Sequence, residues 1–272
     1  MFEVTQRMQD FTLQVYTRMG IAIPASFEAN RQSRVISKRA GDPIWRYGET
    51  ITHWSYIVDG MVAELVNLGP GSGYPLSLHG RNSSFARQEL SGDGRACVDY
   101  VAVTDVELLT LPADVYRALL DADPGFARHL VGMLSRQMQQ QTKLLIVNKC
   151  SNSALRVVGG LALCAEGFGE QRQPMAVHGG ERHHRLLLPL SQQMIARLCG
   201  VSRTLFSEYV GQLAQGNWAQ LQYRGVELLQ LPVWQRVFAH LHRQQVWRSN
   251  PSIGQLMCIL DECAGEPEVL CG

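Results

Sequence analysis

The chain has 272 residues, of which 46% are hydrophobic and 18% are charged, a composition that suits two compact soluble domains. No apolar run is long enough to cross a bilayer, and the first ten residues do not resemble a secretory signal. Seven cysteines without tight spacing favour a reducing cytoplasm over a disulfide framework. The formal net charge of +1 excludes a strongly basic or acidic chain but allows a local basic region.

The N-terminal half of the chain changes texture after residue 30. Residues 1–30 carry the amphipathic pattern of a helix, whereas residues 34–111 alternate short apolar runs with turns such as Asp59-Gly60. Many short strands at such spacing predict an antiparallel sandwich or barrel. The predicted strands are 34–38, 43–45, 54–58, 61–66, 74–78, 96–103 and 106–111.

Helices follow the strands. One is predicted to begin at Pro112 and a longer one at Asp123-Pro124, since proline is favoured in a first turn. In the longer helix a seven-residue apolar seam is interrupted by Gln141 and consists of Val131, Leu134, Met138 and Leu145. So narrow a stripe predicts packing on a second copy of the helix in a homodimer. The alternative is packing on the chain's own barrel.

A further helix is predicted over 151–168, and residues 167–185 have the composition of a linker or loose hairpin. Two short helices then follow, with Ser191 and Ser202 as their capping residues and Gly200 at the end of the first. Helices joined by so short a glycine-containing turn form a helix-turn-helix. Apolar runs at 219–223 and 226–231 predict a hairpin that would be its wing. The alternative is a two-helix piece of an ordinary helical core.

The charge distribution supports the first interpretation. Residues 181–250 hold eight Arg and three Glu, a net of +5, whereas residues 251–272 hold four acids and no base. A local basic excess around a helix-turn-helix is expected for phosphate binding. The tail from residue 232 predicts one more helix and a last segment around 253–263.

The order of small β-barrel, long helix and winged helix resembles the cyclic-AMP receptor protein/Fnr (Crp/Fnr) superfamily of bacterial transcription regulators. The resemblance covers about residues 30–231 and rests on the helix-turn-helix and four short matches. These are GDPI from Gly41, YGE from Tyr47, YIVDG from Tyr56 and VTDVELLTLP from Val103. It implies an α+β fold with an N-terminal cyclic-nucleotide-binding-like β-barrel (jelly roll), a long dimerisation helix and a C-terminal winged helix-turn-helix. The tail beyond about residue 235 exceeds what the family usually has.

The corresponding domains would be an effector-sensing barrel with an N-terminal helix over 1–123 and the dimerisation helix with the following helix over 124–167. Residues 168–272 would form the DNA-binding domain with a C-terminal extension.

In this family the barrel carries a phosphate-binding cassette, F-G-E-x-A-L followed by an R-[ST]-A step. The residues at the matching positions are Phe85, Ala86, Arg87, Glu89, Arg95 and Ala96. Arg95 stands where the phosphate-pairing arginine is expected. However, Arg87 replaces the glutamate that would accept a ribose hydroxyl, and a guanidinium has no acceptor. Ala86 replaces a close-approach glycine and Ala96 a hydroxyl residue, so we do not expect ordinary cyclic-AMP binding.

Two interpretations of the altered cassette remain. Arg87 and Arg95 could bind a different, more anionic effector, or the pocket could be vestigial with Arg87 paired to Glu89 or a nearby Asp. The first cysteine is Cys97, so the N-terminal iron–sulfur cluster of some family members is not expected. Haem would need an axial ligand, for which His79 and His53 are the candidates. His183-His184 and the tail cysteines Cys258, Cys263 and Cys271 fit no standard zinc spacing.

The second helix of the motif should enter the major groove with its N-terminal residues at the base edges. Arg203, Thr204, Ser207 and Glu208 are predicted to face outward there, and Arg203 can donate two hydrogen bonds to guanine. Glu208 departs from the arginine that the family often has. Gln192 and Gln193 would contact phosphates. The predicted DNA-binding residues are Gln192, Gln193, Ser202, Arg203, Thr204, Ser207 and Glu208.

The sequence therefore predicts a cytoplasmic, homodimeric transcription regulator without enzymatic activity. Its expected partners are a pseudo-palindromic double-stranded operator and RNA polymerase, with no membrane. The barrel region holds no paired carboxylates, Ser/His/Asp set or metal-ligand spacing that would support an enzyme. Two alternatives are a redox- or haem-responsive regulator and an interaction module that has lost DNA binding.

Overall fold

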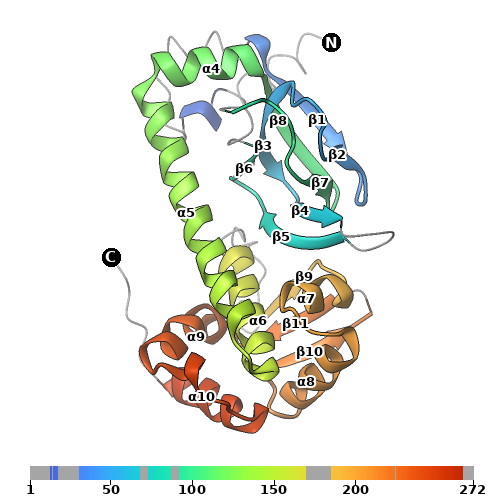
Figure 1. The fold of residues 1–272 in the computed structure, drawn as a ribbon, viewed down its shortest axis with the longest axis vertical. Coiled ribbons are helices and arrows are strands. Elements are labelled where there is room, and N and C mark those ends of the chain that lie inside the picture. Colours follow the sequence, from blue (N-terminus) through green and yellow to red (C-terminus); the bar gives the residue numbers. More distant parts are fainter. Residues whose placement is uncertain are drawn as a thin grey trace, which may run out of the picture. The chain divides into compact units, whose positions relative to one another are not determined.

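The structure is a computed structural model that describes residues 13, 15–17, 31–67, 73–86, 92–169, 185–223 and 225–265. The chain divides into two compact units, Met1–Gln139 and Gln140–Gly272. The boundary falls inside α5 (Pro124–Lys149), so this helix contributes to both units (Figure 1). The predicted three-part division, with boundaries after residues 123 and 167, stays a prediction.

The first unit contains two four-stranded antiparallel sheets, ordered β1-β8-β3-β6 and β2-β7-β4-β5 (Figure 1). The strands are β1 (Arg34–Lys38), β2 (Pro43–Trp45), β3 (His53–Asp59), β4 (Val62–Asn67), β5 (Gly73–His79), β6 (Ser84–Phe85), β7 (Asp99–Ala102) and β8 (Val106–Pro112). Both sheets contribute to one core, since Trp54 and Leu108 of the first are buried in the same cluster as Val62 and Tyr100 of the second. The predicted jelly roll is confirmed, as two sheets that share a core.

The turn between β3 and β4 shows why the sequence alternates strands with glycines. Gly60 has φ +83°, and a Cβ there would lie 2.2 Å from the carbonyl oxygen of Asp105. Only glycine fits such a close approach in a left-handed conformation. The turn, which carries the chain from one sheet to the other, therefore packs directly against the residues at the start of β8.

An aromatic cluster anchors the start of α5 to the sheets. The ring of Trp54 (β3) lies 5.9 Å from that of Tyr116 on α4 (Ala113–Ala122) and 5.6 Å from that of Phe126 on α5. The buried carboxylate of Asp123 accepts a hydrogen bond of 2.8 Å from the backbone N–H of Phe126. This cap confirms that α5 begins at the predicted Asp123-Pro124 step.

The second unit contains the predicted winged helix. After α6 (Ser153–Gly169) come β9 (Arg185–Leu188), α7 (Gln192–Leu198), α8 (Arg203–Gln215), β10 (Ala219–Gln222) and β11 (Gly225–Leu229). The strands form a three-stranded antiparallel sheet in the order β10-β11-β9. The sequence prediction was wrong at Arg185, which it assigned to a linker although this residue begins β9.

The chain continues past the wing into helices. These are α9 (Leu231–Arg243), the 3-10 helix η2 (Val246–Arg248) and α10 (Ile253–Gly265), which confirms the two segments predicted in the tail. The indole N–H of Trp234 on α9 donates to the carbonyl oxygen of Trp218, 3.1 Å away at the start of the wing. The tail is therefore packed into the second unit. Within the described part of the chain, no helix has the length and hydropathy to cross a membrane.

Candidate DNA-binding and effector sites

The helix-turn-helix forms where its capping residues place it. The hydroxyl of Ser191 accepts a hydrogen bond from the N–H of Met194, and that of Ser202 accepts one from the N–H of Leu205, each at 3.2 Å. Between the helices Gly200 takes φ +65°, a left-handed value that ends α7 without a Cβ penalty. The Gly200 turn and the Ser202 cap thus determine where α8 begins.

The two faces of α8 differ in burial as its periodicity predicts. Phe206, Val210 and Leu213 are fully buried in the unit. The opposite row comprises the exposed Arg203, Thr204 and Glu208 and the half-buried Ser207. This row presents a guanidinium, two hydroxyls and a carboxylate, which are groups that can read base edges in a major groove.

Two of the three remaining residues predicted to contact DNA already make hydrogen bonds within the protein. The amide nitrogen of Gln192 donates to the carbonyl oxygen of Gln222 in the wing at 3.2 Å. Ser202 uses its hydroxyl as a helix cap, whereas Gln193 is exposed at the start of α7. Gln192 would have to give up its bond to the wing to reach a phosphate through the same atom, so Gln193 is the better placed of the two.

The wing adds a candidate that the sequence prediction missed. Tyr223 at the end of β10 is 94% exposed. Behind it the carboxylate of Glu227 accepts hydrogen bonds from the side-chain amides of Gln220 and Gln222, at 2.5 and 3.2 Å. These bonds connect side chains of β10 and β11 next to an exposed aromatic side chain that can approach a sugar–phosphate backbone. The signal in the sequence was a tyrosine directly before the Arg224-Gly225 turn.

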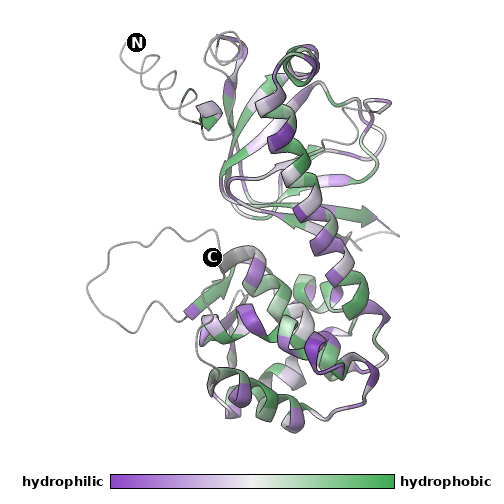
Figure 2. Ribbon diagram, turned by 90° about the vertical axis from the view of Figure 1, so that its left-hand side faces the viewer, coloured by the Kyte–Doolittle hydropathy of each residue, from purple (hydrophilic) through white to green (hydrophobic). Residues whose placement is uncertain are grey.

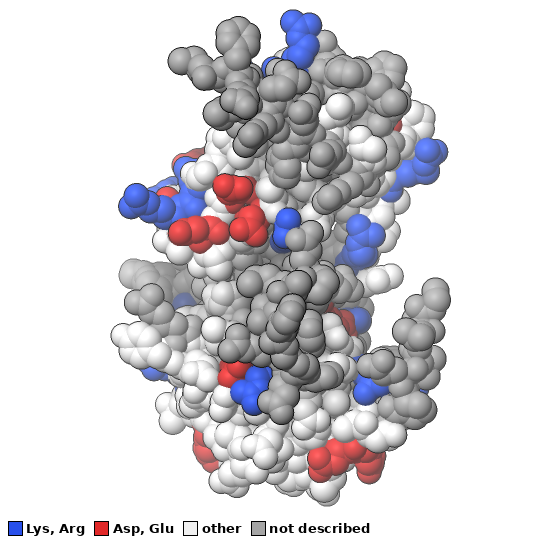
Figure 3. Space-filling view, turned by 180° about the vertical axis from the view of Figure 1, so that it is seen from behind, with Lys and Arg blue, Asp and Glu red and all other residues white. Residues whose placement is uncertain are grey.

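Charge is distributed in small groups on the face of the molecule drawn in Figure 3. There, among the described side chains, basic and acidic residues are interspersed and form no large patch of one sign.

The effector cassette predicted from the resemblance is only partly described. Phe85, Ala86 and Ala96 are buried in the core of the first unit, each less than 3% exposed. Arg95 is exposed, and its guanidinium donates to the carbonyl oxygen of Gly48 at 3.1 Å. In the segment before β7, Ala96 is thus buried and Arg95 faces solvent. Arg87 and Glu89 lie outside the described residues.

Ala86 has a left-handed backbone conformation at the position where the family has a glycine. Its φ is +56°, in the left-handed region that a residue with a Cβ rarely adopts. This conformation costs about 1–3 kcal/mol for a residue with a Cβ, so it is held by the surrounding structure.

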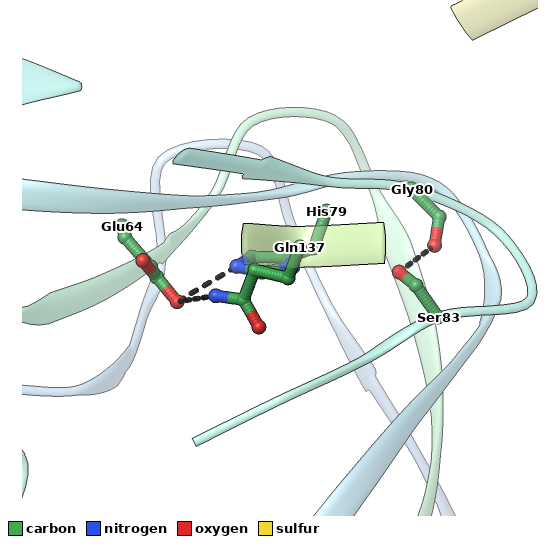
Figure 4. Close-up of polar contacts among 5 residues, drawn as sticks. All are labelled: Glu64, His79, Gly80, Ser83 and Gln137. Carbon is green, nitrogen blue, oxygen red and sulfur yellow. Dashed lines mark hydrogen bonds and ion pairs between the residues drawn. The ribbon is translucent and has the colours of Figure 1, made fainter. Parts of the chain in front are cut away.

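A buried polar cluster lies in the same unit, between the β4–β5 hairpin and α5. The carboxylate oxygen Oε1 of Glu64 lies 2.8 Å from Nε2 of His79 and accepts a hydrogen bond of 3.4 Å from the side-chain amide of Gln137 (Figure 4). Glu64 and His79 are both buried. Because His79 already uses Nε2, that atom is not available as a haem ligand without breaking the cluster.

The second candidate ligand for haem is packed in a different environment. The ring of His53 lies 4.6 Å from that of Trp45, and its Nδ1 lies 3.1 Å from the hydroxyl of Thr52. Burial, and then the charge of Lys38, lower the pKa of His53 below its ordinary value. These contacts fit a structural role.

The cysteines and histidines singled out for metal or redox chemistry do not gather in the described part of the chain. Cys258 is exposed and Cys263 is buried, both on α10. Among the described residues, no three His, Cys, Asp or Glu side chains are grouped to hold a metal ion. Cys271, His183 and His184 lie outside those residues.

The predicted seam on α5 is exposed. Along the helix hydrophobic and hydrophilic residues alternate (Figure 2). The exposed fractions of the seam side chains are 62% for Val131, 37% for Leu134, 66% for Met138 and 57% for Leu145. Large apolar side chains so exposed on one helix are typical of a surface that another molecule covers.

Comparisons with known proteins agree with this architecture. The model of the cyclic nucleotide-binding domain matches residues 35–123. The chain is 28% identical over 189 residues to the cyclic AMP receptor protein of Thermus thermophilus, covering 69% of this chain and 80% of that protein. It is 22% identical over 207 residues to a CRP-like cAMP-activated global transcriptional regulator of Mycobacterium tuberculosis, covering 76% and 89%.

Solved structures share the fold. A CRP/FNR-family transcriptional regulator from Thermus thermophilus superposes with a TM-score of 0.57 at 22% identity, covering 75% of this chain and 97% of that one. FixK2 from Bradyrhizobium japonicum gives a TM-score of 0.59 at 16% identity, covering 81% and 98%. The chain thus contains a region that matches the cyclic nucleotide-binding domain, and its order of jelly roll, long helix and winged helix makes it similar to transcriptional regulators of the CRP/FNR family.

Proposed function

We propose that the chain is a homodimeric, sequence-specific DNA-binding transcription regulator of the Crp/Fnr type. The observation that carries this proposal is the outer row of α8, which presents Arg203, Thr204 and Glu208 to solvent while Phe206 and Val210 hold the helix in place. The chain's similarity to a CRP-like global transcriptional regulator of Mycobacterium tuberculosis, over 89% of that protein, supports it. A role on the chromosome implies a cytoplasmic location.

The second helix would read DNA from its N-terminal end. Its 13 residues extend for about 20 Å at 1.5 Å each, enough to lie in a major groove. Arg203 would donate to guanine O6 and N7, and Thr204 and Ser207 would bond to neighbouring bases. Glu208 would accept from cytosine N4 or orient Arg203. Gln193 and Tyr223 would contact the backbone on either side.

The dimer would form through α5, because its apolar seam needs a partner and a second copy offers a matching one. Two reading heads related by a two-fold axis then require a pseudo-palindromic operator, with half-sites about one helical turn apart. RNA polymerase is the expected protein partner of such a regulator at a promoter.

Cyclic AMP is not proposed as the effector. Arg95 is at the surface and bonded to Gly48, and Ala96 offers no hydroxyl to a phosphate. Titration calorimetry with cyclic AMP should therefore give no saturable heat. Micromolar binding would contradict this part of the proposal and would restore the barrel as an ordinary nucleotide sensor.

DNA binding can be tested without knowing the operator. Genomic fragments retained by the purified chain at moderate salt should share a pseudo-palindromic sequence, and retardation assays should show saturable binding to it. If no fragment is retained above the non-specific background, the chain is an interaction module that has lost DNA binding.

A further inference from the structure

The three residues that join α5 to α6 are covered by the segment that follows the wing. The side-chain amide of Asn152 donates to the carbonyl oxygen of Pro251 at 3.0 Å and to the side-chain oxygen of Asn250. The thiol of Cys150 lies 3.8 Å from the carbonyl oxygen of Trp247 and donates to it. These contacts bridge almost one hundred positions of sequence, so the junction is held from outside the two helices.

Asn152 connects this segment to α6. Its side-chain oxygen accepts a hydrogen bond of 2.8 Å from the N–H of Leu155, which is a helix cap. The amide nitrogen of the same side chain makes the contacts to Asn250 and Pro251. One side chain therefore fixes both the start of α6 and its position against the tail.

Trp247 fills the space where the two helices meet. A Cβ at Gly159 of α6 would lie 2.8 Å from Cη2 of Trp247 and 2.9 Å from a methyl carbon of Val147 on α5. The indole ring also lies 5.1 Å from the ring of Phe238 on α9. Glycine at 159 is thus what allows the tryptophan to sit this close to both helices.

The C-terminal part of α5 is bound by the same tail. The ammonium of Lys143 lies 5.3 Å from the centre of the Phe238 ring, within the range of a cation–π contact. Lys143 also forms an ion pair with Glu166 of α6. The two side chains are 34% and 15% exposed, so the pair is partly shielded from water. Lys143 therefore connects α5 to α6 and α9 at once.

The next residue of α6, Gly160, packs against the helix-turn-helix. A Cβ at Gly160 would lie 2.3 Å from the sulfur of Cys199, which ends α7 and is buried. Adjacent glycines thus let α6 approach Trp247 at position 159 and the reading head at position 160. The orientation of the reading head against the C-terminal part of α5 follows from these contacts within residues 140–265.

We propose that the extension Leu231–Gly265 is an internal clamp that holds the α5–α6 junction in one geometry, so that the reading head is set for DNA without a bound effector. This inference rests on the proposed function. An effector acts by shifting an equilibrium between two conformations of such a junction. When the extension holds the junction in one conformation, an effector has little conformational equilibrium to shift. This agrees with an effector cassette that lacks the family's glutamate, glycine and hydroxyl residue.

Two variants of the full chain separate the clamp from the helices that it holds. Asn152→Asp keeps a side-chain oxygen that can accept from the N–H of Leu155, but it loses the NH2 group that donates to Asn250 and Pro251. Trp247→Ala removes the packing over Gly159. Gln244→Ala, which changes an exposed side chain of the same extension at the end of α9, is the matched control, and circular dichroism verifies that all three proteins fold.

Hydrogen–deuterium exchange of the amides of residues 150–156 tests the clamp directly. Exchange should accelerate at least tenfold in Trp247→Ala and in Asn152→Asp and stay unchanged in Gln244→Ala. If Trp247→Ala does not fold, Asn152→Asp alone decides. Equal protection of the junction in the wild type and in Asn152→Asp overturns the proposal.

Operator affinity tests the consequence. Both variants should bind the retained DNA fragment at least fivefold more weakly than Gln244→Ala, and the wild type should bind it fully without any added effector. Loosened junctions with unchanged affinity would overturn the assigned role of the clamp. If the wild type binds no DNA, the proposed function fails, and the exchange experiment alone then supports or overturns the clamp.

Discussion

Arg203 is the side chain on which base reading should depend most. It is exposed at the first position of α8, directly after the Ser202 cap, where a guanidinium can make two hydrogen bonds to guanine. Arg203→Ala should weaken operator binding by about 1–3 kcal/mol and relax one base position. Fluorescence anisotropy on the operator and on its single-base variants measures both effects.

The matched control removes an arginine that is exposed on the first unit. Arg39→Ala takes away the same charge but leaves the reading head untouched, so it should not alter base preference. An unchanged preference profile in Arg203→Ala would remove this residue from the reading set.

Gly200 gives a prediction about stability. Alanine there would adopt φ +65° and place its Cβ 2.7 Å from the side-chain oxygen of Asn148. Gly200→Ala should lower the free energy of unfolding by about 1–3 kcal/mol, measured by urea denaturation. Gly211→Ala is the opposite case, because its Cβ meets nothing within 4 Å on an exposed helix face and should add about 0.5–1 kcal/mol. Equal effects of the two substitutions would contradict the backbone argument.

His53 predicts a pH dependence of stability. Its Nε2 has no hydrogen-bond partner in the described structure, and burial with the nearby Lys38 charge lowers its pKa below 6.5. Below that pH the unfolded chain takes up a proton that the folded chain resists, so the free energy of unfolding falls. The urea midpoint should therefore drop between pH 7.5 and 5.5, and less steeply in His53→Gln. Parallel profiles for the two proteins would show that His53 is not responsible.

The residues also show how far sequence can predict a site. The burial of Phe206 and the exposure of Arg203 follow from helical periodicity, and both were predictable. The exposure of Arg95 was not, because a motif match carries no information on how the segment before β7 packs against the barrel. Ala86 was identified as a lost glycine, yet only the backbone shows that the left-handed turn persists without it.

Among the elements, β9 shows why one strand of the wing went unpredicted. Its sequence RLLL has no alternation of polar and apolar residues, although Leu186 and Leu188 are buried and Leu187 is exposed. Periodicity cannot identify such a short apolar run, since it becomes a strand only by pairing with β11, which lies about 40 residues further on. The β10–β11 hairpin was predictable because its turn is local.

The α5 seam predicts a dimer that one charge should disrupt. Met138 is 66% exposed at the centre of the seam, and a carboxylate there would be buried without a partner in a paired helix. Met138→Glu should raise the dimer dissociation constant at least tenfold, which is about 1.4 kcal/mol, in sedimentation equilibrium. Gln139→Glu places the same charge on the adjacent exposed residue and should leave the dimer intact. A dimer that survives Met138→Glu must use another surface.

At the scale of the whole molecule, the proposed dimer seam and the proposed clamp would together set the spacing of the operator half-sites. Each reading head is tied to the C-terminal part of α5 by the contacts of Trp247, Asn152 and Lys143. Two copies joined along α5 should therefore present their recognition helices at one separation, matched to half-sites about 10 bp apart. The proposed dimer would therefore bind only half-sites at this separation.

Inserting about 5 bp between the half-sites rotates one of them by half a helical turn, away from its reading head. Affinity should then fall to that of a single half-site, and an insertion of about 10 bp should not restore it, because the second half-site is back on the same face but too distant. In Asn152→Asp the loosened junctions should tolerate spacing changes better than the wild type does, although the absolute affinity is lower. Retardation assays across a spacing series measure this, and equal affinity at every spacing would mean that the two reading heads bind independently.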